Sequence, residues 1–311
     1  MKMDIDLVYL WVDGNDSEWR KKRDAFLGKI DENTEATCKG RYINNDELKY
    51  SLRSVEKYAP WIRRIFIVTD NQIPDWLDTT HSKINIIDHK DILPETVLPC
   101  FNSRIIESCL YKIPGLSERF LLANDDMFFN ANTSADFFFS KDGFPIVRQK
   151  KKNCGKLRYW WKNLRGNVGN YRAVTHRAAA LVEKKFGVYY SGYPHHNIDA
   201  FFKPDFREAI EHVFCEDVEK MRTSRTRANS DVSRHAVLCY ALAIGHGHLN
   251  YSERDVSLTI HVQKTDYMKT LRRYQPQLFC LNDNERTKDE DRDRIKPFLQ
   301  TLFPEKSAFE K

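Results

Sequence analysis

The sequence predicts an α/β fold, with a doubly wound and mostly parallel sheet in its first part and a helical C-terminal half. Three observations predict this class. Short apolar runs alternate with amphipathic helical patterns over the first 130 residues, which is typical of βαβ units with right-handed crossovers. The runs lack polar alternation, as expected of strands buried on both faces of a parallel sheet. Helical patterns then dominate the second half of the chain.

Four apolar runs are the expected strands, and the amphipathic segments between them are the expected helices. The strands are expected at 7–12, 65–68, 84–87 and 120–123, and the helices at 17–29, 46–58 and 103–112. We expect three parts in the chain. They are an α/β core at 1–140, a basic and aromatic insertion at 141–170, and a helical part at 171–311.

The composition excludes several classes of protein. Of the 311 residues, 41% are hydrophobic and 30% are charged, so a sizeable core is available and disorder is not expected. The net charge of +6 is too small and too scattered to indicate nucleic-acid binding. Seven cysteines without any C-x-x-C spacing argue against a disulfide framework or a thiolate zinc site. No apolar run approaches the roughly 20 residues that a bilayer requires. The N-terminus also lacks a signal-peptide pattern, so we expect a cytoplasmic protein.

An acidic residue follows each of the four expected strands. Asp13, Asp70 and Asp88 follow the first three, and Asp125 and Asp126 follow the fourth. Ligands bind beyond the carboxyl ends of the strands in an open parallel sheet, so these acids are expected to line one rim. Alternatively, aspartate simply favours turns. Four strands in succession favour a site, because clustered carboxylates are costly unless a cation or hydrogen-bond donors compensate them.

The adjacent acids Asp125 and Asp126 are the expected metal ligands. Two carboxylates at a strand end suit Mg²⁺ or Mn²⁺, which take oxygen ligands and keep waters and substrate phosphates around them. The sequence has neither a G-x-x-x-x-G-K-[ST] loop nor a G-x-G-x-x-G fingerprint. A metal-bridged diphosphate is therefore the remaining way to bind phosphate.

The segment 44–58 is expected to enter a helix through asparagine and aspartate caps. Asp46, Lys49 and Arg53 recur at i, i+3 and i+7 and therefore share one helix face. From that face Arg53 could point at the anionic oxygens of a ligand. The alternative is a solvated face with local ion pairs.

A basic and aromatic stretch lies inside the segment 141–170. Lysines and arginines at 148–152 lead to the sequence RYWWK at 158–162. Exposed tryptophan and tyrosine between cations can stack on sugars or lie at a membrane surface. In the alternative interpretation the two tryptophans pack into the core and the rest is a solvated loop.

Two adjacent histidines, His195 and His196, follow a turn of glycine and proline. A histidine at such a place can act as a general base or bind phosphate. The alternative is a surface or capping role.

Two further segments carry charge near predicted elements. The arginines of 225–231 precede an expected helix at 232–243 and suit a diphosphate, or they are ordinary surface charge. A short apolar run ends at Asn282 and Asp283, and the charged stretch 286–294 that follows is interpreted as a solvated helix.

Several of these motifs together resemble the Stealth proteins. These are bacterial capsular polysaccharide phosphotransferases related to the catalytic subunit of lysosomal-enzyme N-acetylglucosamine-1-phosphotransferase. The segment 5–16, IDLVYLWVDGND, is similar to the first conserved block of the family. The second block extends over 41–129 and contains RYINNDELKYSLRS and NDDMFF. The third block resembles 193–199 together with 225–231, and the fourth resembles 280–284, so that nearly the whole chain is covered.

This resemblance implies the transfer of a hexose-1-phosphate, expected to be N-acetylhexosamine-1-phosphate, from a UDP-sugar to a glycan hydroxyl. The product is a phosphodiester and the leaving group is UMP, in bacterial capsule or exopolysaccharide synthesis. The family fold is similar to that of GT-A nucleotide-diphospho-sugar transferases. The acceptor oxygen is expected to attack the β-phosphorus in line, with Mg²⁺ or Mn²⁺ as cofactor.

The resemblance also implies roles for the residues of the matched blocks. His196 is assigned as the base or a phosphate ligand, with His195 as the alternative. Asp46 is assigned as a phosphate or metal ligand, and Arg53 and Arg227 are assigned as the cations that clamp the diphosphate. The metal is assigned to Asp125 and Asp126. The nucleotide is assigned to the first and last blocks: Trp11, Val12, Asp13, Gly14, Asn282 and Asp283.

The expected partners are a UDP-hexose donor and a growing polysaccharide acceptor, which could be lipid-linked, and no nucleic acid is expected. The protein is expected in the cytoplasm or peripherally at the inner face of the plasma membrane, where the stretch 148–165 could face the acceptor or lipid head groups. Two alternatives remain open. A GT-A glycosyltransferase would share the fold, metal and donor but release UDP, and a glycan-binding module would not need the carboxylates.

Overall fold

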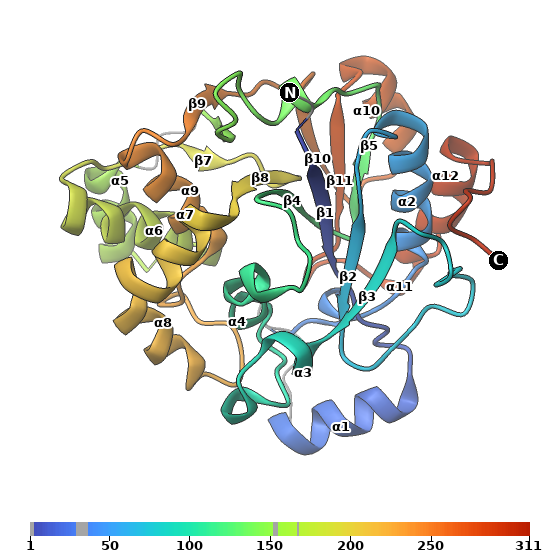
Figure 1. The fold of residues 1–311 in the computed structure, drawn as a ribbon, viewed down its shortest axis with the longest axis horizontal. Coiled ribbons are helices and arrows are strands. Elements are labelled where there is room, and N and C mark those ends of the chain that lie inside the picture. The colour runs from blue at the N-terminus through green and yellow to red at the C-terminus, as the bar shows by residue number, and fades with distance from the viewer. Residues whose placement is uncertain (1–2, 29–36, 152–154, 167) are drawn as a thin grey trace.

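A computed structural model describes residues 3–28, 37–151, 155–166 and 168–311 (Figure 1). Its centre is a five-stranded sheet in the order β3-β2-β1-β4-β8. The strands are β1 (Ile5–Leu10), β2 (Ile65–Thr69), β3 (Ile84–Asp88), β4 (Arg119–Asn124) and β8 (Asp199–Phe202). The first four are parallel and β8 runs antiparallel to β4. The predicted α/β class and mostly parallel sheet are confirmed.

The four predicted strands are confirmed, within two or three residues at their ends. Every residue of β2 is buried, as is β1 up to its last residue, which agrees with strands covered on both faces. The parallel register aligns Leu10 with both Val68 and Asn124, so three strands reach the same edge of the sheet. Of the acids predicted to line this edge, Asp125 and Asp126 line a pocket there, whereas Asp13, Asp70 and Asp88 line neither cavity of the site. Asp70 accepts hydrogen bonds from Trp19 and Lys22, and Asp88 caps the helix His89–Ile92.

Helices cover both faces of this sheet (Figure 1). Leu7 and Tyr9 point to the face covered by α2 (Glu47–Tyr58), where Leu52 packs against them. Val8 points to the opposite face. That face is covered by α4 (Ser103–Ser108), α6 (Asn170–Phe186), α7 (Lys203–Glu208), α8 (Cys215–Arg222) and α9 (Arg234–Ala243).

Two of the predicted helices differ in extent from the observed ones. The segment 17–29 forms α1 (Ser17–Leu27), which Gly28 ends at a positive φ of 75°, and residue 29 lies outside the described residues. The segment 103–112 forms α4 and a separate 3₁₀ turn (Leu110–Lys112), because the helix ends at Cys109. The predicted helix 46–58 is confirmed as α2.

The second half of the chain is helical, as predicted, but it also contributes five strands. β10 (Ser257–His261) and β11 (Leu278–Asn282) form a sheet with β5 (Met127–Phe129), and β7 (Tyr193–Pro194) and β9 (His248–Tyr251) flank β6 (Ile146–Lys150). The remaining α-helices are α3 (His89–Ile92), α5 (Lys156–Leu164), α10 (Tyr267–Tyr274), α11 (Asp289–Arg292) and α12 (Ile295–Leu302). Short 3₁₀ turns occupy Lys39–Arg41, Glu95–Val97 and Ala135–Phe137, and a π-helical turn follows α7 at Ala209–Val213.

The stretch 286–294 differs from its prediction as a solvated helix. Only Asp289–Arg292 is helical, and the guanidinium of Arg292 is buried on the carboxylate of Asp283, with Nε and Nη2 donating at 2.7 and 3.0 Å. This ion pair ties α11 to the end of β11. In the described part of the chain, none of the helices combines the length and apolar character that a membrane span requires.

The predicted division of the chain at residues 140 and 170 stays a prediction. The segment between these positions supplies β6 and α5 and includes residues 152–154 and 167, which lie outside the described residues. Lys152 of the predicted basic stretch is among them.

Candidate active site

A pocket of about 150 Å³ lies at the carboxyl ends of β1 and β4. Trp11 and Val12 follow β1 in its wall, and Asn124, Asp125 and Asp126 follow β4. The pocket opens into a larger cavity of about 730 Å³ between the sheet and the helices of the second half. Residues from distant segments line both spaces and so mark their junction: Arg41, Ser103, Asn124, His196, Arg227, Asn282 and Asp283.

Three carboxyl groups gather on one side of the pocket. Asp125 and Asp126 stand at the end of β4, and Glu47 is the first residue of α2. Loss of hydration raises the pKa of all three, and the neighbouring negative charges raise it further: Asp126 acts on Asp125, Asp125 on Glu47, and Glu47 on Asp126. The cluster therefore carries negative charge that the protein alone does not compensate.

The hydrogen bonds of these carboxyls are incomplete. Glu47 accepts from the backbone N–H and the side-chain amide of Asn45, each at 2.7 Å. Oδ2 of Asp126 accepts from the thiol of Cys280 at 3.3 Å, but its buried Oδ1 has no partner among the described residues. An orphaned buried carboxylate oxygen is costly and points to a ligand outside the protein.

Glu47, rather than the predicted Asp46, is the acid that α2 brings to the pocket. Asp46 caps the helix in a left-handed conformation with φ 66°, and its carboxylate pairs with Lys296 at 2.6 Å. Neither cavity includes it in its lining. Asp46 stands at the N-cap, outside the helical turn from which Glu47 reaches the pocket. The role assigned to Asp46 is therefore not supported by its position.

The structure also places Arg53 away from both cavities. Its Nε and Nη2 donate to the two carboxylate oxygens of Glu310, each at 2.8 Å, and Nη1 donates to the carbonyl of Phe303. These contacts bind α2 to the C-terminal segment of the chain. The prediction that Arg53 clamps a diphosphate is corrected accordingly, because its donors are already used inside the protein.

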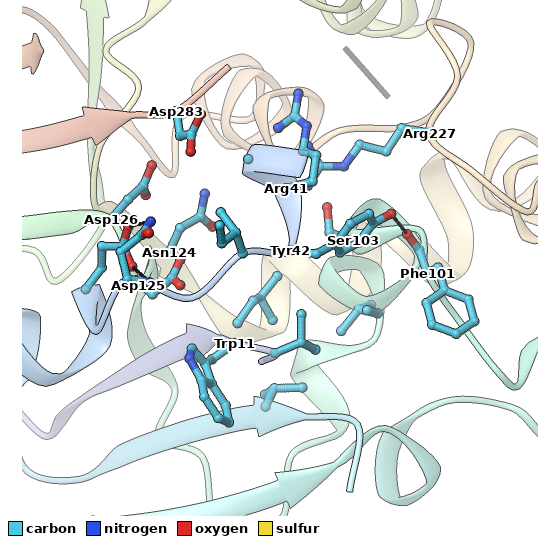
Figure 2. Close-up of a pocket in the computed structure, with 18 of the residues that line it drawn as sticks. Trp11, Arg41, Tyr42, Phe101, Ser103, Asn124, Asp125, Asp126, Arg227 and Asp283 are labelled. Atoms are coloured by element: carbon cyan, nitrogen blue, oxygen red, sulfur yellow. Dashed lines mark hydrogen bonds between the residues drawn. The ribbon is translucent and has the colours of Figure 1, made fainter. Parts of the chain in front are cut away.

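Two other arginines stand across the pocket from the carboxyls. Figure 2 shows Arg41 and Arg227 beside each other, opposite Asn124, Asp125 and Asp126, with Trp11 below them. Burial and the charge of Arg41 lower the pKa of Arg227 to about 9. No hydrogen bond or ion pair joins the side chain of Arg227 to another described residue. A buried cation in this state favours an anionic ligand.

The sequence analysis named Arg227 but missed Arg41. The 3₁₀ turn Lys39–Arg41 carries Arg41 to the junction of the two cavities, next to Tyr42 in the wall. Its signal was available, because Arg41 is the first residue of the segment that resembles the second conserved block. The spacing of charged residues along α2 indicated Arg53 instead.

The four residues of the first block that are predicted to hold the nucleotide divide into two pairs. Trp11 and Val12 line the pocket, whereas Asp13 and Gly14 do not. The backbone N–H of Gly14 donates to the carbonyl of Tyr42 at 2.7 Å, and a Cβ at this position would lie 2.2 Å from the same oxygen. Asp13 accepts from the N–H of Asn15 at 2.9 Å. These two residues support the wall of the pocket but do not line the pocket themselves.

The structure distinguishes between the two histidines. His195 is buried, with Nδ1 3.1 Å from the hydroxyl of Ser257 and Nε2 3.1 Å from a carboxylate oxygen of Asp199. Both ring nitrogens are therefore used inside the protein. His196 adopts a left-handed conformation with φ 58° and lines both cavities. Of the two, only His196 is available to a substrate.

A chain of polar contacts orients His196. Oδ1 of Asn282 lies 3.2 Å from Nδ1 of His261, so its amide nitrogen faces Nε2 of His196, also at 3.2 Å. In this arrangement Nε2 carries the lone pair and Nδ1 the proton. Burial and the charges of Arg234, Lys150 and Arg41 lower the pKa of His196 to about 3, so its ring is neutral near pH 7.

The predicted pair at the end of β11 reaches the junction as expected. Asn282 makes the contact to His196, and Asp283 lines both cavities while its carboxylate holds Arg292. Gly40 lies against that carboxylate, since a Cβ there would come within 2.4 Å of Asp283 Oδ1. The turn carrying Arg41 therefore packs closely on the end of β11.

Whether a divalent cation fits this pocket depends on the carboxylate oxygens of Asp125 and Asp126. No group of three or more His, Cys, Asp or Glu side chains arranged to hold a metal occurs among the described residues. The pair nevertheless offers carboxylate oxygens, an orphaned buried oxygen and uncompensated negative charge. These features fit Mg²⁺ or Mn²⁺ held by two protein carboxylates and completed by waters and phosphate oxygens.

The sequence of this chain matches three conserved regions of one family. Conserved region 1 of the Stealth proteins matches residues 3–31, conserved region 2 matches 41–147 and conserved region 4 matches 269–311. These regions contain the first, second and fourth blocks on which the resemblance was stated.

Curated relatives align along nearly all of this chain. Exopolysaccharide phosphotransferase SCO2594 of Streptomyces coelicolor is 33% identical over 315 residues, which are 99% of this chain and 51% of the relative. Exopolysaccharide phosphotransferase CpsY of Mycobacterium tuberculosis is 34% identical over 320 residues, 99% of this chain and 58% of the relative. Exopolysaccharide phosphotransferase cps2G of Lactiplantibacillus plantarum is 47% identical over 142 residues, 46% of this chain and 41% of the relative. The chain thus spans about half the length of the first two of these relatives.

A solved structure of the galactosyltransferase LgtC with donor and acceptor sugar analogues aligns with 96% of this chain and 95% of its own, at 10% identity and a TM-score of 0.48. That likeness concerns the fold alone. The three matched regions together cover more than half of the chain, and they show that the chain belongs to the Stealth family.

Proposed function

We propose that this protein transfers a hexose-1-phosphate from a UDP-sugar to a hydroxyl of a polysaccharide and releases UMP. The observation that carries the proposal is the junction of the two cavities. There a neutral histidine, His196, shares the lining with Arg41 and Arg227, and Asp125 and Asp126 line the smaller pocket beside them. Such a junction lets a donor in the smaller pocket meet an acceptor in the larger cavity.

The nucleotide diphosphate occupies the smaller pocket in this proposal. Trp11 and Tyr42 offer flat aromatic walls to the nucleoside, and Arg41 and Arg227 offer charge-assisted hydrogen bonds to the diphosphate. The unsatisfied charge of Arg227 supports this placement, because a diphosphate would compensate its burial. N-acetylhexosamine is the first sugar to test, following the resemblance to N-acetylglucosamine-1-phosphotransferase.

Asp125 and Asp126 would hold Mg²⁺ or Mn²⁺ beside the diphosphate. When bound, the cation would neutralise charge on the departing UMP. Glu47 adds a third carboxyl group to this side of the pocket, and burial and the charge of Asp125 raise its pKa to about 8. The arginines on the opposite side would then bind the same phosphates from the other direction (Figure 2).

His196 is the proposed general base. Its Nε2 lone pair takes the proton of the acceptor hydroxyl, which displaces the amide of Asn282 from that nitrogen. Burial contributes most to the low pKa of His196, and nearby cations lower it further; a bound diphosphate would offset the effect of these cations and so raise the pKa. The contact from Asn282 keeps the ring in the required tautomer.

The reaction forms one bond and breaks one. The acceptor oxygen bonds to the β-phosphorus while the bond between this phosphorus and the oxygen bridging it to UMP breaks. The proton of the hydroxyl moves to Nε2 of His196, and the electron pair of the broken bond leaves with UMP. The sugar keeps its bond to the phosphate, so its anomeric configuration is unchanged.

The nucleotide product tests this proposal. The purified protein is incubated with UDP-N-acetylglucosamine, then with other UDP-hexoses, together with Mg²⁺ and a capsule-type oligosaccharide, and the released nucleotide is separated by chromatography. We expect UMP together with a new phosphodiester. UDP with a new glycosidic bond would instead establish the GT-A glycosyltransferase alternative.

Matched histidine variants connect this activity to the junction. We expect His196→Asn to lower the transfer rate by about 10²–10⁴-fold, the usual contribution of a general base. His212→Asn changes a histidine whose side chain is 66% exposed, outside both cavities, and should leave the rate unchanged. Equal rates for the two variants would exclude His196 from the reaction.

We also propose peripheral contact with the inner face of the plasma membrane, where a lipid-linked acceptor would grow. Helix α5 supports this proposal, because it exposes apolar side chains: Leu157 (78%), Trp160 (55%), Trp161 (54%) and Leu164 (63%). Lys156, Arg158, Lys162 and Arg165 alternate with these side chains along the chain. Apolar and cationic side chains combined in this way favour the interface of an anionic bilayer.

Vesicle sedimentation tests the membrane contact. Vesicles with anionic lipid should bind the wild-type protein more strongly than neutral vesicles, and Trp160→Ser combined with Trp161→Ser should abolish the difference. Leu249→Ser removes another exposed apolar side chain, 40% exposed on β9, and serves as the control. Equal sedimentation of the tryptophan variant and the wild type would contradict the proposal.

A further inference from the structure

The N-terminus of α9 faces the larger cavity with polar groups that have no partner. Ser233, Arg234 and His235 all line this cavity, and none of them lines the smaller pocket. Oγ of Ser233, Nη1 of Arg234 and Nδ1 of His235 are buried and lack a hydrogen-bond partner among the described residues. Three such atoms on consecutive residues leave an uncompensated cost of desolvation at one place.

The backbone at the start of α9 is also suited to bind an anion. Ser233 is the N-cap residue of the ten-residue helix α9, yet its side chain caps no N–H of the helix. The N–H of Ala236 donates to the carbonyl of Ser233 at 2.8 Å, so the N–H groups of Arg234 and His235 are the ones without a partner among the described residues at the positive end of the helix dipole. Ser233 is 9% exposed and His235 is 4% exposed, so these side chains are built into the wall of the cavity.

Two further features favour an anion with several oxygen atoms. Nε of Arg234 forms an ion pair with a carboxylate oxygen of Asp199 at 3.4 Å, and Nη1 has no hydrogen-bond partner among the described residues. Burial lowers the pKa of His235 to about 4, so the ring is neutral. When the thiol of Cys239 donates a hydrogen bond to Nε2 of His235, 3.6 Å away, the ring proton lies on Nδ1. Nδ1–H is then a hydrogen-bond donor. The hydroxyl, the guanidinium, the imidazole and the helix N–H groups are all suited to donate to phosphate oxygens.

The charge of the whole cavity agrees with this interpretation. Among the described residues that line it, eight are lysines or arginines and four are acids. Two of the cations, Arg41 and Arg227, belong to the junction and serve the donor diphosphate in the proposed function. Of the other six, Arg104, Arg234 and Arg286 form ion pairs with Asp231, Asp199 and Glu285. The remaining surplus of positive charge lies on the acceptor side, where a neutral polysaccharide would not require it.

We propose that the N-terminus of α9 binds a phosphodiester of the acceptor. This inference rests on the proposed function and extends it. An acceptor that already contains a hexose phosphodiester is a product of the same reaction, so such a site selects for repeated addition. The enzyme then elongates a chain of hexose phosphates rather than placing a single unit on a neutral glycan.

Binding measured without any donor tests the site itself. Calorimetry compares two fragments of the same sugars, a hexose–phosphate–hexose diester and the corresponding neutral disaccharide. We expect the wild-type protein to bind the diester at least about 10-fold more tightly, as a charge-assisted hydrogen bond contributes. Equal affinity for the two fragments would overturn the proposal, whatever nucleotide the enzyme releases.

A charge-reversing variant separates binding from stability. Ser233→Asp places a carboxylate where an N-cap aspartate stabilises a helix, so the variant should fold, and thermal unfolding confirms it. The same carboxylate should repel the diester and remove the preference, while Ser233→Ala should reduce it partly. Ser134→Asp makes the same change at an exposed turn outside both cavities and should bind like the wild-type protein.

UDP binding to the same variants excludes the donor as the occupant. We expect Ser233→Asp to bind UDP as the wild-type protein does, because residue 233 does not line the smaller pocket. A loss of UDP affinity as large as the loss of diester affinity would assign the α9 site to the donor and contradict the proposal. A uronic-acid disaccharide that binds as tightly as the diester would also contradict it, since the site would then select charge alone.

Discussion

At the scale of single residues, the pocket collects negative charge that the protein leaves uncompensated. Burial and the mutual repulsion of Glu47, Asp125 and Asp126 raise the pKa of each group. A carboxyl whose pKa is higher in the folded state than in the unfolded state takes up protons on folding. Such carboxyls therefore destabilise the fold as they ionise with rising pH. A bound cation is expected to reduce this loss of stability.

The pH dependence of stability follows from this sign. As pH rises from about 4, near the unfolded pKa of these acids, through their raised folded values, the unfolded state binds fewer protons than the folded one, so the free energy of unfolding falls. Thermal unfolding at several pH values should show this fall in metal-free buffer and a smaller one with Mg²⁺.

Asp126→Asn is the matched variant for this prediction. It removes one charge of the cluster and should raise the melting temperature near pH 8 by about 1–2 °C, the equivalent of roughly 1 kcal/mol at an unfolding entropy of about 2.1 cal/mol/K per residue. The same variant should lose most transferase activity. A melting temperature that is lower than that of the wild type at pH 8 would show that Asp126 is compensated in the folded protein.

At this scale, strand geometry predicted the place of Asp125 and Asp126 in the pocket, but Asp13, Asp70 and Asp88, which also follow strands, line neither cavity, and the rotation of α2 was not predicted. Asp125 and Asp126 follow a parallel strand, and strand ends converge in any open sheet. Asp46 and Glu47 are adjacent on a helix, and only the packing of α2 determines which of them faces the pocket. The same packing turns Arg53 toward Glu310, a partner 257 residues away that no local pattern indicates.

At the scale of elements, close approach between loops sets the wall of the donor pocket. Gly14, after β1, donates to the carbonyl of Tyr42, and Gly40 packs on the carboxylate of Asp283 after β11. The segment 38–46 is therefore held between the ends of two sheets. This contact brings Arg41 to the phosphates in the proposed function.

Gly14→Ala tests the importance of this contact. The added Cβ would lie 2.2 Å from the carbonyl oxygen of Tyr42, so the segment that carries Arg41 must move. We expect the KM for the UDP-sugar to rise by about 10-fold or more, the effect of losing about 1.4 kcal/mol of binding. Gly169→Ala, which meets no atom within 4 Å, is the control in the same steady-state assay. An unchanged KM would show that the wall tolerates the shift.

The pairing of α2 with the C-terminal segment is a second contact between elements. Arg53 and Glu310 are both buried and form two hydrogen bonds, so removal of one partner leaves the other charge uncompensated. Glu310→Gln should cost about 3–5 kcal/mol of folding stability. Denaturant unfolding measures this loss.

Activity per folded molecule distinguishes this structural role from the predicted catalytic one. At a temperature where Glu310→Gln is folded, its kcat and its KM for the UDP-sugar should match those of the wild type. A rise in that KM without loss of stability would restore Arg53 to the diphosphate site.

At the scale of the whole molecule, the junction of the cavities is assembled from segments far apart in the chain. The ends of β1 and β4 supply its floor, and Arg41, His196, Arg227 and Asn282 come from four other segments. The sequence indicated the floor from the pattern of strands, and it indicated the other segments only through resemblance to conserved blocks. The antiparallel strand β8, which places His195 and His196, has only four residues and left no clear pattern.

The orphaned groups at the start of α9 show the same limit of sequence reasoning. Ser233, Arg234 and His235 form no recognisable motif, and their significance lies in atoms that find no partner after folding. Burial, not composition, identifies them. A site of this kind becomes visible only when the cavity that it faces is known.

The fate of the β-phosphorus tests the central claim most directly. The protein is incubated with UDP-sugar labelled with ³²P at the β position, Mg²⁺ and an oligosaccharide acceptor, and the label is followed by chromatography. The proposed reaction predicts that the label moves into the polysaccharide product, while the nucleotide released is unlabelled UMP. Label retained in UDP, with a glycoside as the product, would contradict it.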